Sequence, residues 1–148
     1  MPPTLFSRLR RYAHYLALVA VLLASSVQAD EPALRKVVLQ LTDASLEKQV
    51  LVLNVADNLV ARYGDRLRLE VVAFGPGLEL LMANNPNDAR ISQLAGQGVR
   101  FSACGNTQRR LAKLTGVAPS LISVSDSVDS GAGRIIELVE QGYVLLRP

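Results

Sequence analysis

The 148-residue sequence contains no tryptophan, one cysteine and one histidine, and aromatic residues make up 5% of it. With Cys104 alone, no intramolecular disulfide can form. The histidine, His14, precedes a long apolar run near the N-terminus. The chain beyond that run therefore lacks the ligands of ordinary zinc, non-haem iron or copper sites, and it lacks a Ser/His/Asp or Cys/His catalytic pair. We expect no metal and no cofactor.

The N-terminal segment has the three parts of a secretory signal peptide. Three arginines within residues 8–11 form a basic start, and residues 15–24 form an apolar core that is short for a bilayer span. Residues 27–29 form an A-x-A-like cleavage site. We predict cleavage after Ala29, which leaves residues 30–148 as one domain, periplasmic or secreted and without membrane attachment. An uncleaved N-terminal anchor is the alternative.

The net charge of +3 belongs to that leader segment. Removal of its three arginines from the 16 Lys and Arg leaves 13, equal to the 13 Asp and Glu. A neutral chain gives no support for nucleic-acid binding. One unpaired cysteine in an exported protein indicates a reactive thiol or an intermolecular bridge.

Strand patterns alternate with helical patterns along the rest of the chain. The predicted strands are residues 36–41, 67–74, 99–104, 121–124 and 143–147. The predicted helices are residues 46–63, 78–82, 88–95, 108–114 and 134–140, and residues 125–133 are predicted as a polar loop. This alternation predicts an α/β fold, with a mainly parallel sheet of about five strands and helices on both faces.

Cys104 falls between the end of a predicted strand and the start of a predicted helix. Gly105 permits a turn there, and Asn106 and Thr107 are good helix N-caps. Backbone N–H groups and the positive dipole end of the helix favour a thiolate over a thiol. The same cysteine can instead be a small buried hydrophobe without chemistry, as most free cysteines are.

The loops that follow the first three strands are expected to meet at one edge of the sheet, where open α/β folds bind ligands. The candidate site residues in the first two loops are Thr42, Asp43, Gly75, Pro76 and Gly77. A tight turn explains the Gly-Pro-Gly segment without any function. Residues 130–134 can hold an anion through N–H groups, although a plain helix N-cap explains them as well.

The order of these segments resembles the DsrE/DsrF-like family, including its YchN-like members, which are small α/β proteins linked to sulfur relay. The similarity rests on residues 36–43, 59–64, 71–81, 98–107 and 141–148. It implies a three-layer α/β/α fold and a homo-oligomer such as a trimer or hexamer. It also implies that a cysteine at the position of Cys104 accepts sulfur as a persulfide.

Three hypotheses follow for the function. In the first, the protein is a periplasmic sulfur carrier, sulfurtransferase-like, whose Cys104 thiolate holds a persulfide beside Gly105, Asn106 and Thr107, with sulfur donor and acceptor unknown. In the second, it is a non-catalytic oligomeric binding or scaffold module, and Cys104 is structural. In the third, Cys104 is a monothiol redox sensor.

Overall fold

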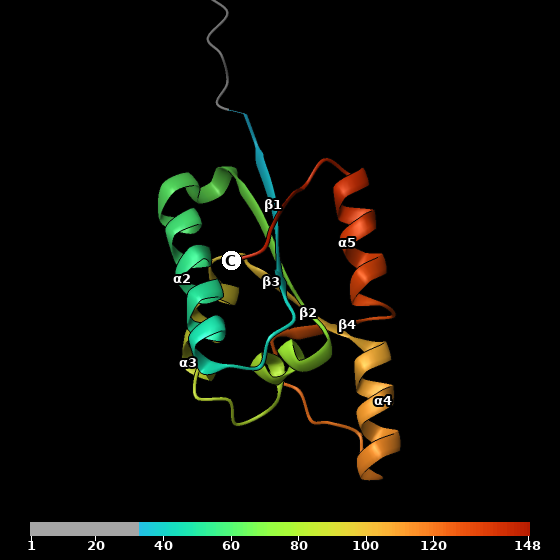
Figure 1. Ribbon diagram of the computed structural model, residues 1–148. Helices are drawn as coiled ribbons and strands as arrows, with labels where there is room; N and C mark the ends of the chain where they lie inside the picture. The colour runs from blue at the N-terminus through green and yellow to red at the C-terminus, as the bar shows by residue number, and fades with distance from the viewer. Residues whose placement is uncertain (1–32) are drawn as a thin grey trace, which may run out of the picture. The chain divides into compact units, whose positions relative to one another are not determined.

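The computed structural model describes residues 33–148, and its elements carry the labels of Figure 1. The predicted signal peptide, residues 1–29, lies outside the described residues. The strands are β1 (Arg35–Leu41), β2 (Leu67–Ala73), β3 (Arg100–Cys104), β4 (Ser125–Val128) and β5 (Val144–Leu146). The α-helices are α2 (Leu46–Tyr63), α3 (Asp88–Gly96), α4 (Gly105–Thr115) and α5 (Gly131–Glu140), and two 3₁₀ helices are η1 (Gly64–Arg66) and η2 (Gly75–Leu81).

The five strands form one sheet in the order β4-β3-β2-β1-β5. Every pairing in it is parallel. Helices α2 and α3 lie on one side of the sheet and α5 lies on the other (Figure 1). Because a parallel pair of strands needs a crossover connection, the helices between the strands cover both faces. The predicted three-layer α/β/α fold is confirmed.

The face under α2 and α3 holds most of the core. Helix α2 buries Val52, Leu53 and Ala56, which recur at helical spacing, and α3 buries Ile91 and Leu94. These side chains pack on buried residues of the three central strands, among them Leu39, Val71 and Phe101. Within residues 33–148 no helix is both long enough and apolar enough to cross a membrane.

The opposite face holds a smaller and more polar core. Helix α5 packs Ile135 and Leu138 against Val38 of β1 and Val72 of β2. Next to this apolar group the sheet buries a carboxylate, Glu70, which is 1% exposed. The two faces therefore differ in chemistry, one being mostly apolar and the other built around a buried charge.

The strand predicted over residues 121–124 is wrong. The fourth strand is β4, which begins at Ser125, inside the segment predicted as a polar loop. As the edge strand of the sheet, β4 leaves its side chains exposed or half-buried, so it carries no apolar pattern. Leu121 and Ile122 are apolar because they pack on the larger core cluster from a loop, where Leu121 forms an isolated bridge to Met82.

One glycine contact predicts a measurable stability difference. A Cβ added at Gly77 would lie 2.4 Å from the carbonyl oxygen of Leu41, which is backbone and cannot move aside. We expect Gly77→Ala to lower the free energy of unfolding by about 1–3 kcal/mol, as overpacking does. Gly96→Ala in α3 is the control, since a Cβ there would meet nothing within 4 Å. Urea unfolding midpoints measure both, and equal midpoints would contradict the crowding at Gly77.

Candidate functional site

The segments after the first three strands meet at the carboxyl edge of the sheet, as predicted, although β3 passes directly into α4 without a loop. The N–H of Phe74 donates to the carbonyl oxygen of Leu41 at 3.1 Å, which joins the residue after β2 to the end of β1. The N–H of Gly75 donates to Oγ1 of Thr107 at 2.9 Å, which joins the segment after β2 to the first turn of α4. These two hydrogen bonds fix the three segments relative to one another.

Cys104 ends β3 and is itself the N-cap residue of α4. Its backbone is extended, with φ −69° and ψ 116°, and the helix begins at the next residue. The prediction that Asn106 and Thr107 are N-caps is therefore wrong, because both lie in the first turn. An extended strand end already has the backbone geometry of an N-cap residue, so no separate cap is needed. The Cys104 residue is 4% exposed.

The sulfur of Cys104 accepts a hydrogen bond from a distant part of the chain. The N–H of Gly131, the first residue of α5, lies 3.1 Å from Sγ. The N-cap of α5, Ser130, satisfies the N–H of Gly133 instead, at 3.2 Å, so the Gly131 N–H is left for the sulfur. The sequence marks residues 130–134 as a helix start, but nothing local indicates that they reach Cys104, 27 residues earlier.

Close packing makes glycine necessary at position 131. A Cβ there would lie 2.9 Å from Cβ of Phe74, the residue that follows β2. With no side chain, the first turn of α5 approaches the sheet edge closely enough for its N–H to reach Cys104.

The pKa of the Cys104 thiol is lowered, although two opposing effects act on it. Burial, the largest effect, disfavours the charged form and would raise the pKa. The hydroxyl of Thr107, the N–H of Gly131 and the N–H groups of Thr107 and Asn106 together outweigh it. The Asn106 N–H contributes least, and it also donates to the carbonyl of Asp129 at 3.1 Å. The site thus favours an anionic sulfur in a nearly dry position.

The remaining predicted residues divide between packing, capping and lining a cavity. Gly105 is buried against the backbone carbonyl oxygens of Val128, in β4, and Asp129, in the loop that follows. A Cβ added at Gly105 would lie 3.0 Å from the Val128 oxygen. Thr42 is exposed. The carboxylate of Asp43 accepts the N–H of Ser45 at 2.7 Å, which lowers the pKa of Asp43 and organises the start of α2.

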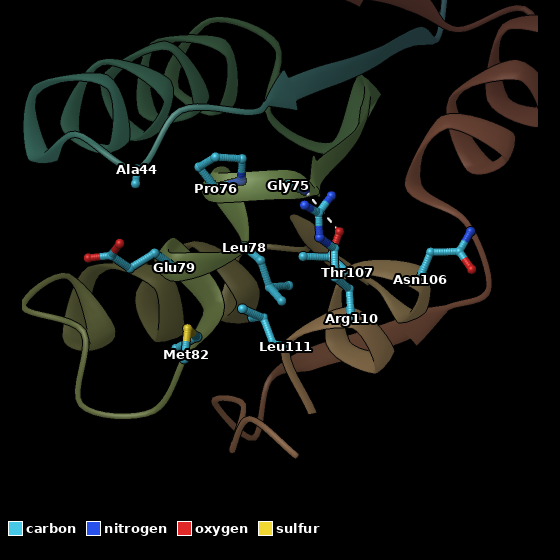
Figure 2. A pocket seen from close by; sticks show the side chains of 10 residues that line it. All are labelled: Ala44, Gly75, Pro76, Leu78, Glu79, Met82, Asn106, Thr107, Arg110 and Leu111. Carbon is cyan, nitrogen blue, oxygen red and sulfur yellow. Dashed lines mark hydrogen bonds between the residues drawn. The ribbon is translucent and has the colours of Figure 1, made fainter. Parts of the chain in front are cut away.

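A cavity of about 580 Å³ lies between η2 and α4 (Figure 2). Its lining residues are Ala44, Gly75, Pro76, Leu78, Glu79, Met82, Asn106, Thr107, Arg110 and Leu111. Half of these residues have apolar side chains, and the cavity also holds one cation, Arg110, and one anion, Glu79. Thr107 belongs both to this wall and to the surroundings of the Cys104 sulfur. The size and lining suit a small, largely apolar molecule.

The chemistry available at this site is that of one nucleophilic sulfur. In residues 33–148 no group of three or more His, Cys, Asp and Glu side chains is arranged to hold a metal ion. Cys104 has N–H and O–H donors around it that stabilise negative charge on sulfur. The chemical property that this edge offers is therefore the stabilisation of negative charge on the Cys104 sulfur.

Removal of the Thr107 hydroxyl is expected to raise the pKa of Cys104. Thr107→Val keeps the shape of the side chain but deletes the group that lowers this pKa most. We expect the ionisation midpoint, followed by thiolate ultraviolet absorbance, to move upward. Thr115→Val at the far end of α4 is the matched control, because its hydroxyl bonds only to Leu111 and Val117. An unchanged midpoint in Thr107→Val would contradict the assignment.

The lowered pKa also gives folding stability a pH dependence of known sign. Unfolded Cys104 titrates near 9.0 and folded Cys104 titrates below that value. Between the two values the unfolded chain binds more protons, so the free energy of unfolding rises with pH, and this contribution is lost as pH falls through the folded pKa. We expect the difference in unfolding free energy between wild type and Cys104→Ser to rise over this window. A flat difference would show that the thiol titrates alike in both states.

No family model matches the chain, and no curated protein matches it either. A solved structure does match, that of a protein of unknown function, MTH1491, from Methanobacterium thermoautotrophicum. The two chains superpose with a TM-score of 0.70 and are 32% identical, over 77% of this chain and 99% of the other. The similarity thus includes almost the whole of that protein. The chain belongs to the same protein family as MTH1491.

Proposed function

We propose that this protein is an exported sulfur carrier that holds sulfane sulfur as a persulfide on Cys104. The observation that carries the proposal is the Gly131 N–H on the Cys104 sulfur at 3.1 Å. A neutral thiol is a weak acceptor, so an N–H directed at it has its main value for an anion, either thiolate or persulfide. The resemblance to the DsrE/DsrF-like family supports the same chemistry.

The transfer step exchanges one S–S bond for another. The Cys104 thiolate attacks the outer sulfur of a donor R–S–S–H, and a bond forms between the two sulfurs. The S–S bond of the donor breaks, and its electron pair leaves with the donor as the thiolate R–S⁻. The outer sulfur keeps its proton and becomes the end of a Cys–S–S–H group, which then ionises beside the donors of α4 and α5. An acceptor thiolate removes the outer sulfur by the same exchange.

The cavity beside Thr107 favours a small-molecule sulfur donor over a protein donor. Its apolar lining suits the hydrocarbon or sulfur chain of an organic persulfide or polysulfide. Arg110 offers a cation for a negative end of such a donor.

Export and self-association belong to the same proposal. Export rests on the signal-like residues 1–29. Self-association as a trimer or hexamer rests on the family resemblance, and it gains support from Leu114 in the last turn of α4 and Val117 just after that helix. Each of them is 72% exposed, which is unusual for large apolar side chains lying three residues apart.

The second candidate function is a binding or scaffold module in which Cys104 only packs. The observation that favours it is the 4% exposure of Cys104, since a carrier must admit its donor and acceptor to the sulfur. Reactivity of the folded thiol separates the two candidates.

Incubation with polysulfide tests the carrier function directly. We expect the folded wild-type chain to gain one or more sulfur atoms, read as intact mass under non-reducing conditions, and to lose them on addition of dithiothreitol. Cys104→Ser is the control and should gain none. Native mass spectrometry of the same samples reports the number of copies in the assembly.

An unchanged mass, together with a thiol that is alkylated only after denaturation, would reject the carrier and favour the scaffold. Faster reaction with peroxide than with polysulfide would reject it in favour of the redox sensor.

A further inference from the structure

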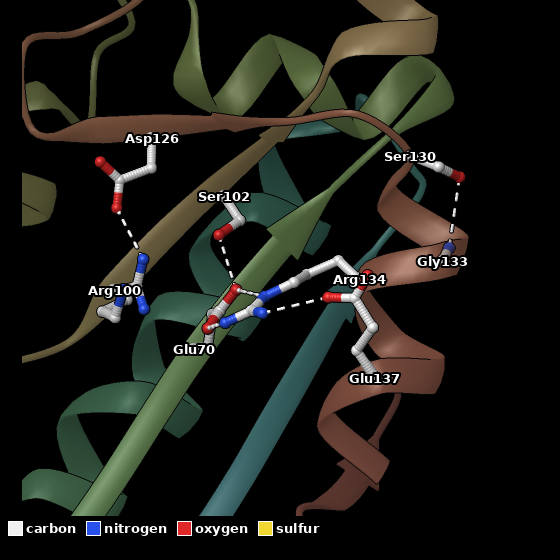
Figure 3. Close-up of polar contacts among 8 residues, drawn as sticks. All are labelled: Glu70, Arg100, Ser102, Asp126, Ser130, Gly133, Arg134 and Glu137. Atoms are coloured by element: carbon white, nitrogen blue, oxygen red, sulfur yellow. Dashed lines mark hydrogen bonds and ion pairs between the residues drawn. The ribbon is translucent and has the colours of Figure 1, made fainter. Parts of the chain in front are cut away.

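A buried ion pair joins the middle of the sheet to α5. Glu70 of β2 is 1% exposed, and its two carboxylate oxygens accept from Nε and Nη2 of Arg134, each at 2.8 Å (Figure 3). The hydroxyl of Ser102 on β3 donates to the same carboxylate at 2.6 Å. A third guanidinium nitrogen of Arg134 donates to Glu137 at 3.2 Å. The carboxylate of β2 is therefore held by one neighbouring strand and one helix.

The Glu70–Arg134 pair fixes the orientation of Arg134 more than it stabilises the fold. Burial raises the pKa of Glu70, but the hydrogen bonds from Arg134 and Ser102 outweigh it, so the net pKa is lowered and the group stays ionised. A buried pair recovers little net free energy, because both charges lose their water. Two parallel N–H to oxygen bonds do, however, fix the guanidinium plane and so the position of Arg134.

Arg134 lies one helical turn after Gly131, so whatever fixes Arg134 fixes the start of α5. Besides the Gly131 N–H on Cys104 and the β4 pairing that leads into the helix, α5 contacts the sheet through Ile135 and Leu138, which are apolar and have no preferred direction. At the end of the helix near Cys104, the Gly131 backbone packs against Phe74.

We propose that the Glu70–Arg134 pair is a positioning device that holds the first turn of α5 on the sheet, and with it the Gly131 N–H on the sulfur of Cys104. Glu70 and Arg134 touch neither the sulfur nor the cavity, so they are positioning residues and not catalytic ones. The functional value of this positioning rests on the persulfide chemistry proposed for Cys104.

The pair acts through geometry, because its electric field reaches Cys104 weakly. The carboxylate accepts from Ser102, which is two residues before Cys104 on β3, about 7 Å at ~3.3 Å per residue. One buried charge alone would act over that distance, and salt would screen it little. The two charges of the pair cancel, however, so removal of both leaves little net field to lose.

The test replaces both members of the pair and reads the ionisation of Cys104. The variant Glu70→Gln/Arg134→Met removes the two charges together and keeps both side chains long. We expect the thiolate absorbance midpoint to rise by about one pH unit, a tenfold loss of thiolate below the midpoint. The control is Arg100→Gln/Asp126→Asn, which removes an ion pair on β3 and β4 whose side chains are 57% and 62% exposed, and which should leave the midpoint in place.

An unchanged midpoint in a folded double variant would overturn the positioning role. Arg134→Lys keeps the positive charge but loses the bidentate hydrogen bonds to Glu70. This variant should fold even if the double variant does not, and it should also raise the thiolate midpoint. An unchanged midpoint there also contradicts the inference.

The midpoint is measured without any sulfur donor, so the two proposals can fail separately. A shifted midpoint in a protein that never gains sulfur would reject the carrier function and keep the positioning role. If Glu70→Gln/Arg134→Met and Arg134→Lys both gained sulfur at the wild-type rate with an unchanged midpoint, the carrier function would stand and the positioning role would be rejected.

Discussion

The parallel pairing of the strands is the constraint on which the rest of the molecule depends. Each strand leaves the sheet at the same edge, and the next helix starts there. The N–H groups at the start of α4 and α5 are consequently brought to the edge where β3 ends at Cys104. A sulfur placed there meets donors from two helices without any dedicated binding loop.

The two faces of the sheet contribute differently to the fold. The face under α2 and α3 is an apolar core, with the non-directional burial that stabilises a domain of this size. The face under α5 holds few buried apolar residues, and the Glu70 carboxylate takes the place that another such residue would fill. Apolar packing fixes which helix lies on which face, and the ion pair fixes how one of those helices is aligned.

The sequence is sufficient for features that depend on local patterns and insufficient for those that depend on distant contacts. The helix over residues 46–63 is predicted with both ends correct, since its apolar spacing, its Ser45 cap and the glycine after it agree. The position of Cys104 at a strand–helix junction is equally local. Strand β4 is missed because an edge strand buries too little to show a pattern. The N–H of Gly131 is missed because its partner lies 27 residues away.

Cys104 is the N-cap residue of α4, yet its side chain makes no capping hydrogen bond to that helix in the part of the chain that the structure describes. The groups of the first turn of α4 instead favour negative charge on the sulfur. Such a coupling is reciprocal, so the charge on the sulfur supports the helix start by the same free energy that the helix start gives to the charge. Alkylation prevents the sulfur from ionising, so it removes this electrostatic support and is expected to loosen the first turn of α4.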